Sequence, residues 1–351
     1  MYPRIIINKD KFRHNLRTML DISHANNLTV MAVSKVFCAD QELLSIMIEE
    51  EVDFIADSRI QNLTGIHSVI PKVLLRLPMH GEVIEVVKHS DISLNSELST
   101  IKLLNSAAKD LNKIHGIIVM IDLGDLREGI IEEIELFSVV EEVLKMEHIA
   151  LRGIGTNLTC YGGIIPTEEN LSRLVEFKDK IEQKYDISLE IISGGNSSSI
   201  ELMNNGLIPV GINNIRLGES VVLGRETAFG NFIDNTYNDV FTFEADIIEV
   251  KEKPTVPIGL RGMNAFGKVP IFKDKGITLR AILAVGKQDV DHTELIPFDT
   301  VNAIGSSSDH IIVDVSNSYN VYEVGDQMLF RLTYGSILSL MTSKYVTKYY
   351  E

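Results

Sequence analysis

The sequence predicts an α/β protein in which an N-terminal (β/α)8 barrel, a TIM barrel, precedes a C-terminal all-β domain. Between about residues 27 and 224, short β-rich runs alternate with segments of helical periodicity, as in parallel sheets with crossover helices. Eight such units in roughly two hundred residues match a closed barrel better than an open doubly wound sheet. After residue 224, strand-like runs follow one another without helices between them.

The predicted barrel strands are short, apolar and bounded by polar or glycine-containing segments. In chain order they are 28–35, 53–57, 72–77, 92–95, 116–123, 151–158, 189–193 and 214–218. Amphipathic stretches between them have apolar residues three and four positions apart, which is the spacing of a helix packed on a sheet. These stretches are 41–50, 99–111, 131–146, 167–185 and 198–205. The predicted barrel domain therefore spans residues 8–229.

Residues 230–351 predict a β domain, to which the strand-like residues 1–7 add a strand before the chain enters the barrel. Its predicted strands are 241–250, 256–260, 278–283, 310–315 and 327–332, and a helical pattern at 336–341 precedes a closing segment at 344–350. A chain of 351 residues with 45% hydrophobic content can bury a large core and favours two domains over one.

Charge and composition exclude several classes of function. The formal net charge of −16, from 33 Lys+Arg and 49 Asp+Glu, argues against nucleic acid or an anionic membrane surface as partner. No apolar run approaches the ~20 residues of a membrane span, and no secretory signal pattern opens the chain. We therefore expect a cytoplasmic enzyme. Neither the nine histidines nor Cys38 and Cys160 have metal-ligand spacing, so no metal site is expected.

Lys35 is the most informative single residue, because it ends the apolar run 28–35 where a core strand would carry another aliphatic side chain. A desolvated lysine can supply a neutral amine that forms a Schiff base, although strand-end lysines more often extend to water. Active sites of such barrels lie at the carboxyl ends of the strands. Other chemically active residues follow predicted strands in the same way: Arg127, Asn157, Asn196, Ser197 and Arg216 to Glu219.

Two segments have the composition of phosphate-binding loops. Residues 193–199 (SGGNSSS) follow the seventh strand and open a helix, so backbone amides and hydroxyls can face an anion; helix capping alone would explain only one serine. Residues 216–219 (RLGE) follow the eighth strand, where barrels often bind phosphate, although a surface Arg–Glu pair is the alternative. Residues 262–269 nearly match a P-loop, but Val269 replaces the required Ser or Thr, so nucleoside triphosphate binding is rejected.

A lysine after the first strand and phosphate donors after the seventh and eighth resemble the layout of the pyridoxal-phosphate enzymes of the alanine racemase fold (fold type III). The resemblance covers nearly the whole chain. Residues 32–35 (AVSK) are similar to the family's cofactor-lysine segment. Residues 122–129 (DLGDLREG) resemble its strand-five segment, with Arg127 at the position that approaches the substrate carboxylate. Residues 32–38 together with 263–267 (MNAFG) are similar to the ornithine racemase branch.

The resemblance implies a homodimeric, pyridoxal-phosphate-dependent amino-acid racemase (an isomerase) that interconverts the L and D enantiomers of ornithine or a related basic amino acid. The β domain would complete the partner's active site, and Lys35 would be the catalytic base on one face. The implied cofactor-binding residues are Lys35, Asn157, Asn196, Ser197, Arg216, Gly218, Glu219 and Tyr345, and the implied substrate-binding residues are Arg127 and Asp309. Alternatives are a decarboxylase or aldolase of the same fold, alanine racemase, or a coenzyme carrier without turnover.

The chain departs from the alanine racemase pattern at two positions. Leu260 stands where that pattern carries its catalytic tyrosine, and Asn157 stands where a histidine would flank the ring. The second acid/base is therefore open, with Tyr334, His310 and Asp309 as candidates. A diamino-acid substrate would also need a carboxylate for its distal ammonium group, and the candidates for that role are Asp309, Glu219 and Asp125.

Overall fold

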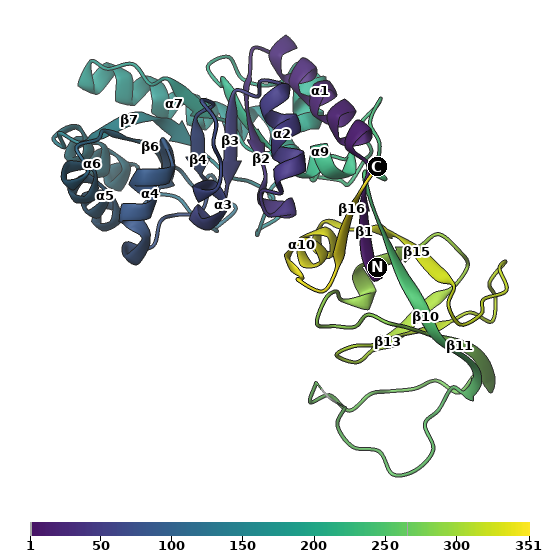
Figure 1. Ribbon diagram of the computed structural model, residues 1–351. Helices are drawn as coiled ribbons and strands as arrows, with labels where there is room; N and C mark the ends of the chain where they lie inside the picture. Colours follow the sequence, from purple (N-terminus) through teal and green to yellow (C-terminus); the bar gives the residue numbers. More distant parts are fainter. Residues whose placement is uncertain (1, 265) are drawn as a thin grey trace. The chain divides into compact units, whose positions relative to one another are not determined.

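The computed structural model describes residues 2–264 and 266–351 (Figure 1). The chain forms two compact units, which are described separately below. One consists of residues 11–238, and the other combines residues 1–10 with residues 239–351. The N-terminal and C-terminal segments therefore belong to the same unit.

Strands β2 to β9 of the first unit form a closed barrel with parallel pairing. The last strand returns to the first, with Met31 opposite Arg216 and Ala32 opposite Leu217. The predicted (β/α)8 architecture is confirmed. The strands are β2 (Thr29–Val33), β3 (Phe54–Asp57), β4 (Lys72–Leu74), β5 (Ile92–Asn95), β6 (His115–Met120), β7 (Ile149–Gly155), β8 (Ile191–Ser193) and β9 (Asn214–Leu217).

Helices cover the outside of the barrel (Figure 1). They are α1 (Lys9–Ala25), α2 (Gln41–Glu49), α3 (Ile60–Thr64), α4 (Val83–His89), α5 (Leu98–Asp110), α6 (Glu133–Leu144), α7 (Glu168–Tyr185), α8 (Ile200–Asn204) and α9 (Glu219–Leu223). The periodicity located α2, α5, α6 and α7 to within two residues but missed α1, which buries Phe12, Leu16 and Met19. Local signals fix the ends of α7: Thr167 and Asn170 form a capping box, and Asp186 ends the helix in a left-handed conformation.

The barrel interior is filled by side chains that alternate along the strands, among them Met31, Val33, Ile118 and Met120. One position must be glycine. A Cβ atom on Gly153 of β7 would lie 1.7 Å from the carbonyl oxygen of Ile191 on β8. The closure of the sheet at this point therefore depends on the absence of a side chain.

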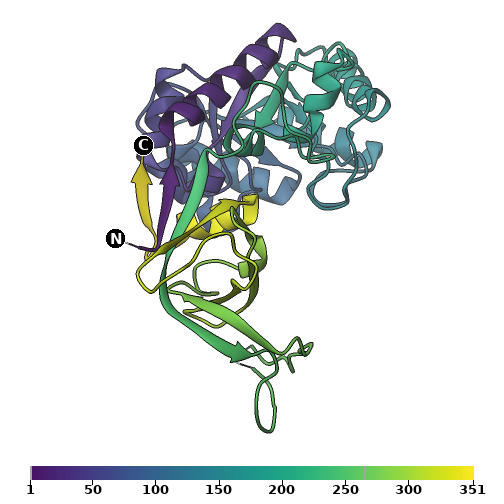
Figure 2. The ribbon, with the colours of Figure 1, turned by 90° about the vertical axis from the view of Figure 1, so that its right-hand side faces the viewer.

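The second unit is built on an antiparallel sheet with strand order β12-β15-β10-β11-β14-β13. Strand β1 (Arg4–Ile7) pairs antiparallel with β10 and parallel with β16, so that both chain ends join the sheet (Figure 2). The remaining elements are β10 (Phe241–Pro254), β11 (Ile277–Leu283), β12 (Leu295–Pro297), β13 (Asn302–Ser306), β14 (Ile311–Asp314), β15 (Gln327–Leu332), α10 (Tyr334–Thr342) and β16 (Thr347–Tyr350).

The predicted strand at 256–260 is wrong. These residues lie in the long connection between β10 and β11, where Pro257 lacks an amide donor and Gly259 has a φ of 111°. Within the same connection, the Asn264 side chain accepts hydrogen bonds from the amides of Phe266 and Lys268 at 3.0 Å each. Ala265, which belongs to the P-loop-like and MNAFG segments, lies outside the described residues, as does Met1 of the N-terminal strand-like run.

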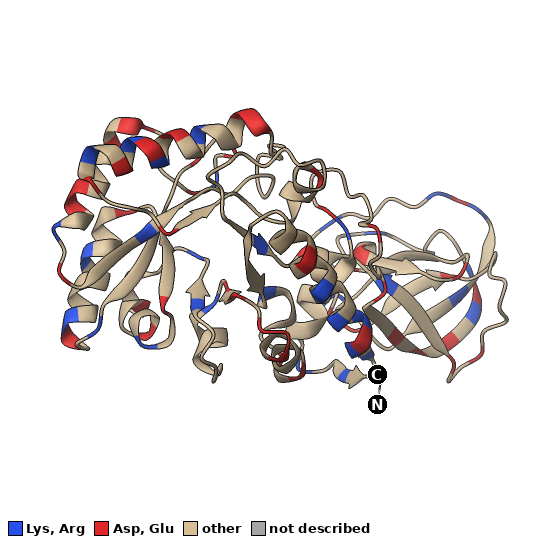
Figure 3. Cartoon of the chain, turned by 90° about the horizontal axis from the view of Figure 1, so that it is seen from above, with Lys and Arg blue, Asp and Glu red and all other residues tan. Residues whose placement is uncertain are grey.

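Acidic and basic residues are interspersed along the helices of the barrel unit (Figure 3). On α1, for example, Arg17 pairs with Glu50 at 2.5 Å, and on α7 Lys178 pairs with Glu182 at 2.9 Å. Ion pairs at the protein surface contribute little to stability individually. No helix in the described part of the chain is long and apolar enough to cross a lipid bilayer.

Candidate active site

Lys35 lies immediately beyond the carboxyl end of β2, as the first residue of a short 3-10 helix, η1 (Lys35–Phe37). The amide of Ser34 donates to the carbonyl of Ala56 on β3 at 2.9 Å, and Val36 and Phe37 are buried. The backbone on both sides of Lys35 is thus anchored. The lysine itself is partly buried at the carboxyl-terminal mouth of the barrel, as the sequence predicts.

A buried carboxylate stands next to this segment. Asp57, the last residue of β3, accepts hydrogen bonds from the Ser34 hydroxyl at 2.7 Å, the Arg59 amide at 2.8 Å and the Asn62 side chain at 3.0 Å. Burial raises the pKa of Asp57, while these hydrogen bonds and the positive charge of Lys35 oppose the rise. The sequence alone did not identify Asp57 as a site residue, although Asp57 ends a predicted strand. We interpret it as a positioning residue for the Ser34–Lys35 segment.

Arg216 of β9 is buried among the ends of the neighbouring strands. Its guanidinium donates to the Ser193 hydroxyl at 2.5 Å, to the Thr156 carbonyl at 2.6 Å and to Asn157 Oδ1 at 3.5 Å. Burial lowers the pKa of Arg216 to about 10, so the side chain still carries its proton at neutral pH. The structure therefore brings the predicted residues Arg216 and Asn157 together, with β8 between them.

The two phosphate-loop candidates meet directly. Asn196 caps the short helix η3 (Ser197–Ser199) by accepting from the Ser198 amide at 2.9 Å, and its amide group donates to Asn157 Oδ1 at 3.1 Å. The Ser197 hydroxyl donates to the Ser220 hydroxyl at 3.1 Å and accepts from the Ser220 amide at 3.2 Å. These contacts join η3 to the first turn of α9, and the Arg216 amide donates to the Gly195 carbonyl at 3.1 Å, which joins the two segments directly.

Two glycines in these loops, Gly195 and Gly218, allow the backbone to pack closely against neighbouring side chains. Gly195 has a φ of 118°, and a Cβ atom on it would lie 2.6 Å from the Ser199 hydroxyl oxygen. A Cβ atom on Gly218 would lie 3.1 Å from the Cβ of Val33, so the second loop packs against the strand that leads to Lys35. Glu219, which follows, uses its carboxylate in an ion pair with Arg225 at 2.6 Å.

Three buried polar atoms around these loops have no hydrogen-bond partner among the described residues: Thr156 Oγ1, Asn157 Nδ2 and Ser198 Oγ. Buried polar groups in folded proteins are nearly always hydrogen-bonded, so these atoms are suited to a polar ligand. Hydroxyl and amide donors match the phosphate and ring substituents of pyridoxal phosphate. Over the residues that are described, no group of three or more His, Cys, Asp or Glu side chains could hold a metal ion.

Arg127 lies on the loop after β6. The loop is closed at its base by the bridge between Ile121 and Ile130. The guanidinium of Arg127 forms two hydrogen bonds with the carboxylate of Glu128, and this pairing raises the pKa of Arg127. Asp125 of the same loop is buried, and its carboxylate accepts from the amides of residues 161, 162 and 164 at 3.0, 3.0 and 3.3 Å. Asp125 therefore anchors the loop after β7 and is not available to bind a substrate ammonium group.

The remaining candidates belong to the β unit. Asp309 is exposed and accepts from the Ser308 hydroxyl at 2.7 Å, and His310 lies 3.4 Å from the Ser307 hydroxyl. Tyr345 is largely exposed, and Tyr334 begins α10. These side chains therefore lie at the surface of their own unit or at the start of its helix.

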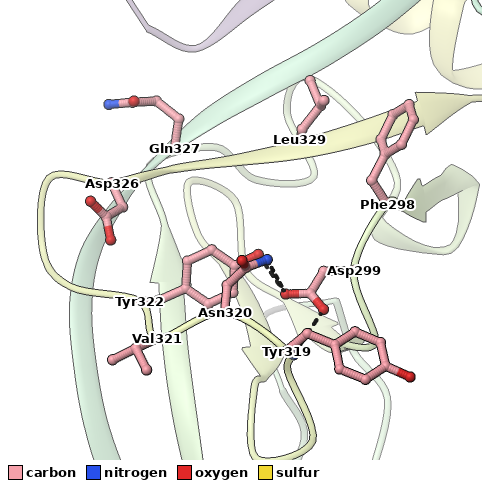
Figure 4. Close-up of a pocket in the computed structure, with 9 residues that line it drawn as sticks. All are labelled: Phe298, Asp299, Tyr319, Asn320, Val321, Tyr322, Asp326, Gln327 and Leu329. Atoms are coloured by element: carbon pink, nitrogen blue, oxygen red, sulfur yellow. Dashed lines mark hydrogen bonds between the residues drawn. The ribbon is translucent and has the colours of Figure 1, made fainter.

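A hollow of about 570 Å³ lies in the β unit beside Asp299 (Figure 4). Asp299 accepts from the Tyr322 hydroxyl at 2.9 Å, Asn320 Nδ2 at 2.9 Å and the Tyr319 amide at 3.1 Å. Burial raises the pKa of Asp299, but these hydrogen bonds and those from Ser318 outweigh burial and lower it. The carboxylate thus serves to order its own loop, and the hollow offers no comparable set of unpartnered polar atoms.

A barrel with a lysine after its first strand and a linked pair of phosphate-type loops is the layout of pyridoxal-phosphate enzymes with a barrel fold. The match to a family model agrees with this class. The model for the alanine racemase N-terminal domain matches residues 7–226, so the chain belongs to the alanine racemase family. It is 49% identical over 350 residues to the ornithine racemase of Acetoanaerobium sticklandii, with 99% of each chain covered. It is 40% identical over 357 residues to the lysine racemase of Thermotoga maritima, covering 100% of this chain and 99% of that one.

Solved structures share the fold at low sequence identity. The alanine racemase from Streptomyces coelicolor A3(2) matches with a TM-score of 0.75 and 16% identity, covering 99% of this chain and 97% of that one. The alanine racemase from Bartonella henselae, which has covalently bound pyridoxal phosphate, matches with a TM-score of 0.73 and 16% identity over 99% of both chains. A D-threonine aldolase from Filomicrobium marinum matches at 0.71 and 12% identity, over 97% and 88% of the chains.

Proposed function

We propose that the protein is a pyridoxal-phosphate-dependent racemase that interconverts L- and D-ornithine. The observation that carries the proposal is full-length similarity to an ornithine racemase in a chain whose barrel mouth combines Lys35 with the linked loops. The 40% identity to a lysine racemase favours lysine as the second candidate substrate. Both relatives in the comparison act on basic amino acids.

The residues of this chain fit the coenzyme. Lys35 would hold its aldehyde carbon covalently, and Asn196, Ser197 and the amides of Gly218 and Glu219 would hold its phosphate, together with Tyr345 from the β domain. Arg216 and Asn157 would face the ring. When bound, the coenzyme supplies an electron-withdrawing system that stabilises negative charge at the substrate Cα.

The protein side of the reaction consists of binding and proton transfer. Arg127 would bind the substrate carboxylate, while Asp309 would contribute to the substrate site from the β domain. Lys35 would remove or return the Cα proton on one face. Arg216 keeps its own proton at neutral pH, so it can donate a hydrogen bond to the ring nitrogen without protonating it. This hydrogen bond would favour the return of the proton to Cα over transamination.

The test of the proposed function is a panel of amino acids incubated with the protein and pyridoxal phosphate in deuterated solvent. Chiral chromatography is expected to show conversion of L-ornithine to a mixture of both enantiomers, with deuterium at Cα and no loss of carbon. Lysine should react more slowly, and alanine at least about tenfold more slowly in kcat/KM. Loss of carbon dioxide, cleavage of the side chain, or no exchange with any amino acid would each contradict the proposal.

We further infer a homodimer in which the β domain of one subunit completes the site of the other and supplies the second acid/base, with Tyr334, His310 and Asp309 as candidates. The support is the connection between β10 and β11, on which Ile258, Leu260 and Ile271 are almost fully exposed. Monomeric proteins seldom expose so many apolar side chains on one segment. A second copy of the chain is the occupant that the proposed shared site requires.

Replacing both Leu260 and Ile271 with aspartate is expected to shift the protein from dimer to monomer in sedimentation velocity and to abolish racemisation. Val69, an equally exposed apolar residue of the barrel unit, provides the control, and Val69→Asp should leave both properties unchanged. A wild-type protein that is fully active while sedimenting as a monomer would refute the shared site.

A further inference from the structure

A diamino-acid substrate carries a distal ammonium group that needs a carboxylate, and the candidates named from the sequence do not supply one in the barrel unit. Asp125 is taken up by three backbone amides, and Glu219 is paired with Arg225. Asp57 is buried beneath Ser34. Asp122 accepts from the amides of Gly124 and Leu126. Glu128 differs from these residues because its partner, Arg127, is the residue proposed to bind the substrate carboxylate.

Glu128 is held in a defined place by its loop. The Asp122 amide donates to the Ile130 carbonyl at 3.1 Å, and the Asp122 carboxylate accepts from the Gly124 amide at 2.7 Å. Gly129 follows Glu128 with a φ of 129°, and a Cβ atom on it would lie 2.5 Å from the Asp122 amide nitrogen. Only glycine fits this close packing, so the backbone next to Glu128 is held in a defined conformation.

The side chain of Glu128 points to Arg127, and both oxygens of its carboxylate accept from the guanidinium. The Glu128 side chain is 15% exposed, and that of Arg127 is 42% exposed. Burial lowers the pKa of Arg216 in the proposed ring site, and the charges of Glu128 and Arg127 also affect this pKa, in opposite directions. An anion and a cation are therefore presented together on the loop after β6.

Resting on the proposed function, we propose that Glu128 is the specificity residue of this site: it binds the distal ammonium group of a diamino acid while Arg127 binds the α-carboxylate. When a substrate carboxylate takes over Arg127, Glu128 loses its partner. A neutral amino acid would leave this mostly buried carboxylate unpaired, which is unfavourable. The distal ammonium group of ornithine replaces Arg127 as the partner of Glu128. The Arg127–Glu128 ion pair is thus exchanged for two ion pairs with the substrate, one at Arg127 and one at Glu128.

The test compares ornithine with norvaline, which has the same carbon chain without the distal amine. Glu128→Gln keeps the shape of the side chain and removes its charge. We expect kcat/KM for ornithine to fall at least about tenfold, mainly through KM, and kcat/KM for norvaline to stay unchanged or rise. Glu135→Gln, on the exposed face of α6, is the matched control and should retain the wild-type ratio of the two substrates.

Binding provides a readout that is independent of turnover. The α-methyl derivatives of ornithine and norvaline lack the Cα proton, and their dissociation constants can be measured by titration calorimetry on the coenzyme-loaded protein. Wild type should prefer α-methylornithine, and Glu128→Gln should lose at least about tenfold of that preference. Glu128→Asp, which keeps the charge on a shorter side chain, should fall between the two.

The outcomes separate this inference from the function on which it rests. A wild-type protein that racemises ornithine, with a Glu128→Gln variant that retains the full preference for ornithine in both assays, overturns the role of Glu128 and leaves the proposed function standing. A wild-type protein that exchanges the Cα proton of neither substrate overturns the proposed function. If Glu128→Gln does not fold, the Glu128→Asp comparison decides the inference by the same ratio.

Discussion

Replacing Lys35 with alanine is expected to lower racemisation at least about 10⁴-fold, because the same amine is proposed both to hold the coenzyme and to transfer the Cα proton. The variant should also lose the visible absorption band of covalently held coenzyme. The backbone at this position is fixed by the hydrogen bond from Ser34 to Ala56 and by the buried Val36 and Phe37. The barrel should therefore remain folded, which circular dichroism checks.

A further variant distinguishes the amine of Lys35 from its positive charge, and a second provides the control. Lys35→Arg retains a cation but lacks a nucleophilic amine, so it should be as inactive as Lys35→Ala. Lys102→Ala, on the outer surface of α5, removes an exposed lysine and should leave activity and absorbance unchanged. Small primary amines added to Lys35→Ala should restore part of the activity, because they replace the missing base. A Lys35→Ala protein with wild-type absorbance and turnover would refute the proposed chemistry.

The position of Lys35 could be predicted from the sequence because its signal is local. The apolar run before it specifies a buried strand, and the change to a charged residue marks the end of that strand. The same is true of residues 193–199, where glycines and hydroxyl residues follow an apolar strand. Barrel closure was predictable only as a count of strand–helix units. The pairing of β9 with β2 joins segments about 185 residues apart and leaves no local trace.

Other features of the site depend on contacts that no local pattern specifies. The sequence gives no sign that Asp125 anchors residues 161–164 or that Glu219 pairs with Arg225, so both seemed available to a substrate. Glu128 was overlooked for the converse reason, since adjacent Arg and Glu residues are usually an unremarkable surface pair. At 256–260, apolar residues suggested a strand, but in the structure they remain exposed on a connection. Their burial, if a second subunit provides it, cannot be deduced from one chain.

His115 leads to a prediction about stability rather than catalysis. It begins β6, at the end of the strand opposite the site, and is only 2% exposed. Its Nε2 atom lies 2.8 Å from the Ser93 hydroxyl on β5, and Asn95 donates to the same hydroxyl at 2.9 Å. Burial lowers the pKa of His115 to about 4, although the charge of Asp91 acts in the opposite direction. The folded protein therefore holds this imidazole in its neutral form across most of the acidic range.

The sign of the pH dependence follows from this difference in pKa. The unfolded chain binds a proton at His115 below pH ~6.5, whereas the folded protein does so only near pH 4, so the unfolded state binds more protons between these values. The contribution of His115 to stability is complete above pH ~6.5 and declines as the pH falls through this window. A difference of this size corresponds to a loss of roughly 3 kcal/mol by pH 4.

Urea denaturation of wild type and His115→Gln between pH 7.5 and pH 4 measures this contribution, because glutamine can keep a hydrogen bond to Ser93 but does not titrate. The variant is expected to start less stable at pH 7.5, through imperfect packing, and to lose roughly 2–3 kcal/mol less than wild type on acidification. Carboxylates titrate in the same window in both proteins, so only the difference between the two curves reports on His115. The exposed His67 gives the control, since His67→Gln should follow the wild-type curve. Parallel curves for wild type and His115→Gln would show that the buried imidazole is not the group that makes this barrel sensitive to acid.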